Sequence, residues 1–313
     1  MIATTLDPQT RTPAGSVPIA LPDVPPDLRA RPSWRTVKNL VMLSLMGAAL
    51  VLVAIPLVAV LWAVIERGAA IAFRGFPDFF TETIPVVSRR PGPGMGPAIL
   101  GTLMVTGGAT LIAVPLGILG AVYLHEYGGN GKFARVVRFM STVMTGVPSV
   151  VMGLFVYLIW TLNFGYSAFG GALALAFLML PVVIGSAEQM LRLVPQQLRE
   201  AAYALGATKS RTILTVVLPA ALPGIVSGSL LAVARAAGET APLLFAVGAA
   251  IAYNAHIFSE ANTALSVQIF ANANSSFVAA QERAWAAALT LVLLTFLLTL
   301  VARVFTARLA LKR

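Results

Sequence analysis

Long apolar runs separated by short polar segments dominate this chain of 313 residues. A helix needs about 20 apolar residues to cross the hydrocarbon layer of a bilayer. Lipid offers no hydrogen-bond partner to an exposed backbone, so apolar runs of this length must fold as helices. We therefore expect an all-α integral membrane protein with six spans, at residues 40–65, 98–123, 139–161, 171–187, 219–248 and 284–305.

The composition agrees with a membrane protein. Only 11% of the residues are charged, whereas soluble domains carry about 25%. The net charge of +10 is dispersed over short loops and forms no basic stripe, which argues against nucleic-acid binding. The absence of cysteine excludes disulfides, thiolate metal sites and cysteine nucleophiles. The only histidines, His125 and His256, are far apart in the sequence, so we expect neither a metal site nor a catalytic residue.

The N-terminal segment differs from the rest of the chain because it is rich in proline and poor in long apolar runs. Such a composition cannot bury a core, so we expect residues 1–39 to form a disordered cytoplasmic tail. The first apolar run is too long for the core of a signal peptide. Residues 40–313 are then the transmembrane domain.

Basic residues predict the orientation of the chain in the membrane. Cytoplasmic loops of membrane proteins carry an excess of Lys and Arg. With the N-terminus inside, 16 of the 22 basic residues lie in inner segments and five in outer segments. We therefore expect a multi-pass protein of the cytoplasmic (inner) membrane with both termini in the cytoplasm. Its inner segments are residues 1–39, 124–138, 186–213 and 303–313.

A polar island between the fourth and fifth spans is predicted to be a helical hairpin. Pro195 suits the first position of a helix, and Gly206 suits a left-handed stop. A second helix would begin at Thr208 or Ser210 and run to Val217. An amphipathic helix that lies on the membrane surface is the alternative interpretation of this island.

The spacing within the island resembles the EAA loop of ABC-importer permeases. The matching residues are Glu200, Ala201, Ala202 and Gly206, followed by Leu218-Pro219; Val216 stands where that family usually has Ile. The resemblance implies a six-span ABC importer permease bundle whose coupling helix sits in a groove of a cytoplasmic ATPase. It also implies that Glu200, Ala201 and Gly206 contact this ATPase, with Ala202 in the same helix.

The chain itself is not expected to hydrolyse ATP. A phosphate-binding P-loop requires Gly, four residues, and then Gly-Lys followed by Ser or Thr. The stretch from Gly206 to Ser210 lacks the glycine before Lys209, and Gly131-Lys132 is followed by Phe133. We therefore expect no enzyme activity and no cofactor in this chain, and a partner chain that uses ATP.

Two charged residues, Arg235 and Glu239, interrupt the fifth apolar run. Their spacing of four places them on one helix face, where they can pair. An unpaired Arg in mid-bilayer costs about 2.5–3.5 kcal/mol on insertion scales, so such residues face a bundle interior or a pathway. Two interpretations follow: a buried ion pair that fixes helix packing, or an anion site on a transport path.

The residues that follow favour the anion site. The stretch from Gly238 to Pro242 should break the helix, because Pro242 disfavours helical geometry at Ala241 and cannot donate a backbone hydrogen bond. A half-helix that starts near Pro242 would point free N–H groups at the gap. Arg235, the Thr240 hydroxyl and these amides could together hold a tetrahedral oxyanion. Glu239 would repel the anion, so we expect it to hold Arg235 at rest or to take up a proton.

The segment 234–245 resembles the signature of PstA-type permeases of phosphate ABC importers. Further similar stretches are residues 115–127, 146–155, 180–184 and 284–288, and the resemblance covers about residues 97–313. Gly185 departs from the pattern, since relatives often carry a base there. The resemblance implies that Arg235 and Glu239 serve phosphate passage. It also implies a homologous second permease, two copies of an ATP-binding ATPase and an extracytoplasmic phosphate-binding protein as partners.

Three other functions stay open at this point. An ABC permease for another oxyanion, such as sulfate or molybdate, would carry the same EAA loop. An ion-coupled secondary transporter would use Glu239 as its proton carrier, and a membrane scaffold would transport nothing. Two structural expectations remain as well. The small polar residues of segment 141–149 should serve helix packing, with pore lining as the alternative, and residues 264–270 should form a short interfacial helix.

Overall fold

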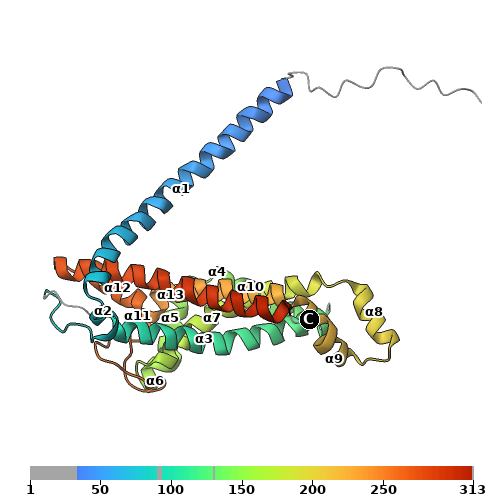
Figure 1. Ribbon diagram of the computed structural model, residues 1–313. Helices are drawn as coiled ribbons and strands as arrows, with labels where there is room; N and C mark the ends of the chain where they lie inside the picture. The colour runs from blue at the N-terminus through green and yellow to red at the C-terminus, as the bar shows by residue number, and fades with distance from the viewer. Residues whose placement is uncertain (1–33, 90–93, 130, 312–313) are drawn as a thin grey trace, which may run out of the picture. The chain divides into compact units, whose positions relative to one another are not determined.

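The computed structural model describes residues 34–89, 94–129 and 131–311, with only the backbone described for residues 305–311. These described residues are folded almost entirely as helices (Figure 1). The helices are α1 (Trp34–Arg74), α2 (Asp78–Thr81), α3 (Gly96–Val122), α4 (Lys132–Gly146), α5 (Ser149–Val156), α6 (Leu162–Phe164), α7 (Ala168–Arg192), α8 (Gln196–Ala204), α9 (Lys209–Thr212), α10 (Leu218–Ala237), α11 (Ala241–Ala246), α12 (Leu265–Ala273) and α13 (Val278–Leu311). Three π-helical turns continue α3, α5 and α9: η1 (Tyr123–Tyr127), η2 (Tyr157–Thr161) and η3 (Ile213–Val217).

The chain divides into two units, Met1–Leu57 and Val58–Arg313. Residues 34–39, which we expected in the N-terminal tail, are helical and belong to α1. The rest of that predicted tail, residues 1–33, lies outside the described residues.

The structure confirms an all-helical chain with five or six candidate spans. Among the described residues, five helical stretches are long and apolar enough to cross a membrane: Trp34–Arg74, Gly96–Tyr127, Ala168–Arg192, Lys209–Ala237 and Val278–Val304. The count is six if α4 and the helical stretch Ser149–Phe164, which meet at an angle of 108°, form one bent span.

The bend in this third span corrects our expectation of one helix over residues 139–161. The backbone is extended at Val147, with ψ of 128°, and Pro148 follows directly. A proline disfavours the helical conformation of the residue before it. Gly146-Val147-Pro148 therefore ends α4, and Ser149 begins α5 in a new direction.

The centre of the unit Val58–Arg313 is α7. It runs through Pro181 without a break. Its core residues Leu175, Met179 and Val183 pack with Val105 of α3. Alanine and glycine along α7 allow neighbouring backbones to approach closely, as is common between membrane helices. At its start, the Ser167 hydroxyl accepts a hydrogen bond of 3.1 Å from the Gly170 N–H.

The short helix α12 agrees with the interfacial helix predicted at residues 264–270. Figure 1 shows it toward the end of this unit that lies away from α8. The Leu265 N–H donates to the Thr102 hydroxyl oxygen at 2.8 Å, which joins α12 to α3. Gly101 permits this approach, because a Cβ there would lie 1.9 Å from the Thr263 carbonyl oxygen.

We predict that Gly101→Ala destabilises the bundle, whereas Gly107→Ala in the same helix does not. The added methyl group at position 101 meets backbone, and overpacking of this kind costs about 1–3 kcal/mol. No atom lies within 4 Å of a Cβ at position 107, so the change there should stay within about 0.5 kcal/mol. Thermal melting of the purified variants in detergent measures both, and equal melting temperatures would contradict the packing described.

Candidate functional site

The fifth span breaks where the sequence predicted. The helix α10 ends at Ala237, Gly238 follows it, and α11 begins at Ala241 with Pro242 in its first turn. The last turn of α10 is closed by hydrogen bonds from the Gly238 N–H to the Arg235 oxygen (3.2 Å) and from the Glu239 N–H to the Ala236 oxygen (3.1 Å). Arg235 and Glu239 thus sit at the edge of a helix break.

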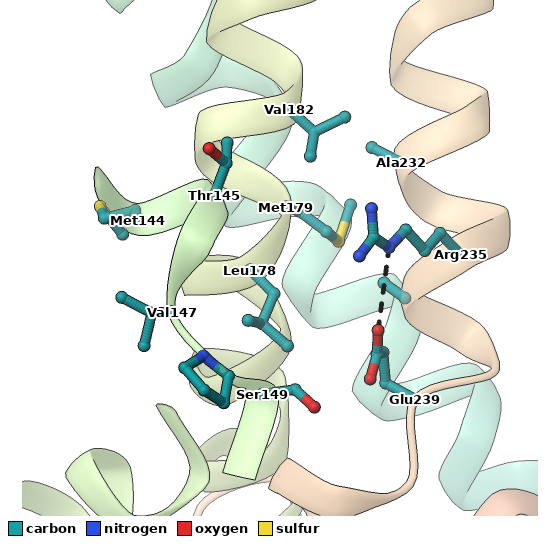
Figure 2. A pocket seen from close by; sticks show the side chains of 12 residues that line it. Met144, Thr145, Val147, Ser149, Leu178, Met179, Val182, Ala232, Arg235 and Glu239 are labelled. Atoms are coloured by element: carbon teal, nitrogen blue, oxygen red, sulfur yellow. Dashed lines mark ion pairs between the residues drawn. The ribbon is translucent and has the colours of Figure 1, made fainter. Parts of the chain in front are cut away.

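A cavity of about 260 Å³ lies beside this break (Figure 2). A water molecule occupies about 30 Å³ in the liquid, so the cavity has room for a small ion with some of its water. Its walls come from the α4–α5 bend, from α7 and from α10. The lining residues are Met144, Thr145, Val147, Pro148, Ser149, Leu178, Met179, Val182, Ala232, Arg235, Ala236 and Glu239.

The ion pair at this cavity is loose and is not buried within the single chain, unlike the buried pair that was one of our two interpretations. The Arg235 Nε and the Glu239 Oε1 are 3.9 Å apart, longer than a good hydrogen bond. The Arg235 side chain is 74% exposed and that of Glu239 is 24% exposed. Both point toward the cavity in Figure 2. An exposed ion pair contributes little to stability, so this geometry speaks against a packing role for the pair.

Thr240 lies in the break, but it is not among the residues that line the cavity. The half-helix α11 has only six residues, and the charge at the N-terminus of so short a helix is small because few peptide dipoles add up. Arg235 is therefore the main positive group at the cavity, and the end of α11 contributes less than the sequence suggested.

Two hydroxyl groups, those of Thr145 and Ser149, line the cavity, which agrees better with the alternative of pore lining than with helix packing. The Thr145 hydroxyl donates to the Thr142 oxygen at 2.6 Å, and Ser149 opens α5 directly after the bend. The motif Gly146-Val147-Pro148 was the signal that could have revealed this placement, because it turns the span at this point.

The predicted hairpin is present as α8 and the turn that follows it. Gly206 has φ of +79°, the left-handed conformation that ends the helix. The second helix differs from the prediction, since α9 continues through η3 into α10 and does not end at Val217. Of the four residues assigned to ATPase coupling, Glu200, Ala201 and Gly206 are exposed. The fourth, Ala202, is only 8% exposed and packs inside the chain, so in this conformation a partner cannot reach it.

A charged cluster between α4 and α7 was not predicted. The Glu188 Oε1 accepts hydrogen bonds from the Arg138 Nε at 3.1 Å and from the Arg192 Nη2 at 2.8 Å. This carboxylate therefore joins α4 to the end of α7. In the part of the chain that the structure describes, no three His, Asp or Glu side chains gather in a way that could hold a metal ion.

The cavity is expected to admit water when the chain is in its membrane complex. The chain has no cysteine, so single cysteines report on their own surroundings. A thiol reacts as its thiolate, which requires water. We predict that Thr145→Cys reacts with a charged methanethiosulfonate reagent at least about tenfold faster than Leu111→Cys, whose side chain is exposed on the apolar helix α3. Equal rates would contradict a hydrated cavity.

Comparison with known proteins places this fold and site in context. The family model described as binding-protein-dependent transport system inner membrane component matches residues 113–311. The phosphate transport system permease protein PstA 1 of Mycobacterium tuberculosis is 44% identical over 271 residues, which cover 86% of this chain and 88% of that protein. The phosphate transport system permease protein PstA of Yersinia pestis is 39% identical over 282 residues, covering 90% and 94%.

A solved structure supports the fold alone. A bacterial ABC transporter involved in the import of the acidic polysaccharide alginate has a chain with a TM-score of 0.53 and 17% identity, covering 85% of this chain and 98% of that one. Together with the sequence matches, this means that the chain belongs to the binding-protein-dependent transport system inner membrane components and, within them, to the PstA permeases.

Proposed function

We propose that this chain is one permease subunit of an ATP-driven importer of inorganic phosphate and forms half of its translocation pathway. The observation that carries the proposal is the exposed guanidinium group of Arg235 on the wall of a largely apolar cavity, beside a break in the helix. Names of relatives support the choice of anion, since the PstA proteins are described as permeases of phosphate transport systems.

The chemistry of the cavity suits a tetrahedral oxyanion. A guanidinium group presents a planar fork of donors that matches two phosphate oxygens. The hydroxyl group of Ser149 lines the same cavity and can donate to a further oxygen, whereas the Thr145 hydroxyl already donates to the Thr142 oxygen. In this proposal Glu239 holds Arg235 at rest, and the pair separates when phosphate passes. A contact of 3.9 Å is weak enough for this exchange.

The remaining parts of the importer are inferred from the family. Both termini and α8 face the cytoplasm, where two copies of an ATPase bind Glu200, Ala201 and Gly206. A homologous second permease completes the pathway, and an extracytoplasmic binding protein delivers phosphate. This chain hydrolyses no ATP in this arrangement; it converts movement of α8 into movement of the spans.

We predict that Arg235→Gln lowers phosphate uptake by about tenfold or more. A hydrogen bond to a charged group contributes about 1.5–3 kcal/mol, and about 1.4 kcal/mol corresponds to a factor of ten. Uptake of radiolabelled phosphate is measured in cells that lack their own phosphate importer and contain the complete set of partner subunits, at matched membrane levels. Arg235→Lys, which keeps the charge but not the fork, should be intermediate. Normal uptake by Arg235→Gln would remove Arg235 from the transport step.

We also predict that Glu239→Gln lowers both the KM for phosphate and the maximal uptake rate. Loss of the negative charge removes the repulsion of the anion and the group that competes for Arg235, so phosphate is held longer. Kinetics of uptake in the same cells provide the measurement. If neither parameter changes, Glu239 has no part in the mechanism.

The same assay separates the alternative substrates and mechanisms. If unlabelled sulfate or molybdate suppresses uptake as effectively as unlabelled phosphate does, the chain serves another oxyanion. Uptake that continues after ATP is depleted, while the proton gradient is maintained, would indicate a secondary transporter.

A further inference from the structure

A buried ion pair links α8 to the end of α3. The Arg199 Nη2 donates to the Glu126 Oε1 at 2.9 Å, although the two residues are 73 positions apart. The side chains are only 8% and 7% exposed, respectively. Removing one partner from a buried ion pair leaves an uncompensated charge and is strongly destabilising. The two elements are therefore expected to stay together.

Arg199 also binds the end of α7. Its Nη1 donates to the Val194 oxygen at 2.7 Å, and its Nη2 donates to the Leu191 oxygen at 3.1 Å. A positive charge is favourable at this end of a helix, because the last carbonyl groups carry partial negative charge. The planar fork of Arg199 thus holds the start of α8, the end of α7 and the end of α3 in one fixed geometry.

The π-helical turn η1 is the element that receives these contacts. The Leu124 oxygen accepts a hydrogen bond of 2.7 Å from the Arg138 Nη2, and the Lys209 ammonium lies 4.8 Å from the centre of the Tyr127 ring. Together with Glu126, these residues connect η1 to α4, α8 and α9. Such π-helical turns occur frequently at functional sites, and this one places Glu126 toward Arg199.

The helix α3 extends this connection to the far end of the bundle. Near its start, the Thr102 hydroxyl accepts the hydrogen bond from the Leu265 N–H of α12. The next residue of α12 is Ser266, and its hydroxyl donates to the backbone carbonyl oxygen of Glu239 at 3.0 Å. A continuous series of contacts therefore leads from α8 through Arg199, Glu126, α3 and α12 to the helix break at the cavity.

We propose that Glu126 and Arg199 are positioning residues, which make α8 and α3 move as one body and so transmit the displacement of α8 to the helix break. The proposal rests on the proposed function, in which α8 is the coupling helix. Without Glu126, α8 would keep the Arg199 hydrogen bonds to the end of α7 and its packing at Ala202, but it would lose the ion pair that joins it to η1 and so to α3. Displacement of α8 would then reach α3 less directly.

The first test measures how phosphate transport depends on ATP hydrolysis. The complete transporter, reconstituted in proteoliposomes with its binding protein, is compared with the variant Glu126→Gln. This substitution keeps the size of the side chain and one acceptor but removes the charge. We expect the phosphate transported per ATP hydrolysed to fall by at least about fivefold, while basal hydrolysis stays within about twofold. Glu66→Gln, which removes an exposed carboxylate from α1, should leave the ratio unchanged.

Two further variants separate positioning from a general loss of structure. Because Glu126 acts through Arg199, the double variant Glu126→Gln with Arg199→Gln should be no worse than the poorer single variant. Arg199→Lys keeps the charge and should retain part of the coupling. An unchanged ratio of transport to hydrolysis in Glu126→Gln, or single effects that add up in the double variant, would overturn the proposal.

The second test needs no phosphate and therefore distinguishes this inference from the proposed function. The chain has no cysteine, so spin labels can be placed at Leu119→Cys on α3 and Gln197→Cys on α8, both exposed positions. We expect the distance between the labels to be the same in the ATP-free and ATP-bound transporter and to differ between these states in Glu126→Gln. If the distance changes between these states in the otherwise wild-type chain, α8 and α3 do not move as one body and the proposal is overturned, even if phosphate uptake is normal. If the distance stays the same but no phosphate is taken up, the proposed link between α8 and α3 holds and the assignment of phosphate as the substrate is wrong.

Discussion

The hydrocarbon layer leaves no partner for a free backbone group, and the whole architecture depends on this constraint. A membrane span can interrupt its helix only where the freed groups are buried in protein or face a polar cavity. Within the described residues, the helix stops at Val147–Pro148 and at Gly238–Thr240, and both places adjoin the same cavity. They also pack on each other, because a Cβ on Gly153 of α5 would lie 2.6 Å from the Cα of Pro242. In the proposed function, the place where these two breaks meet is where phosphate lies during its passage.

Close packing keeps this site in place and connects it to the rest of the bundle. Small residues bring α3 against α7, as at Gly117, where an added Cβ would lie 2.6 Å from the side chain of Val183. Packed helices of this kind transmit movement because they cannot deform continuously. Charged side chains add to the connection at the end near α8, where Glu126 and Glu188 each accept a hydrogen bond from an arginine of another helix. The apolar interior sets the shape, and these few ion pairs determine which helices move together.

Much of this could be predicted from the sequence, for physical reasons that differ from place to place. The spans follow from the length of the apolar runs, and the break after Arg235 follows from Gly238 and Pro242. The turn after α8 follows from Gly206, whose left-handed backbone favours glycine. The bend at Pro148 was signalled by its sequence but was hidden in an otherwise apolar run. Long-range partners could not be predicted, because neither periodicity nor spacing pairs Glu126 with Arg199 across 73 residues. The exposure of Arg235 was also missed, since a charge in an apolar run looks the same whether it faces a neighbouring helix or a cavity.

The central claim is that the guanidinium group of Arg235 faces the translocation pathway and binds the anion there. The most direct measurement is a structure of the assembled transporter, with both permeases, the ATPases and the binding protein, captured while phosphate occupies the membrane-spanning part. We predict density for phosphate within hydrogen-bond distance of the Arg235 guanidinium group, in the cavity between the two helix breaks, with Glu239 turned away. A phosphate ion that crosses the membrane without contact to Arg235, or an Arg235 side chain enclosed between helices away from the pathway, would contradict the account.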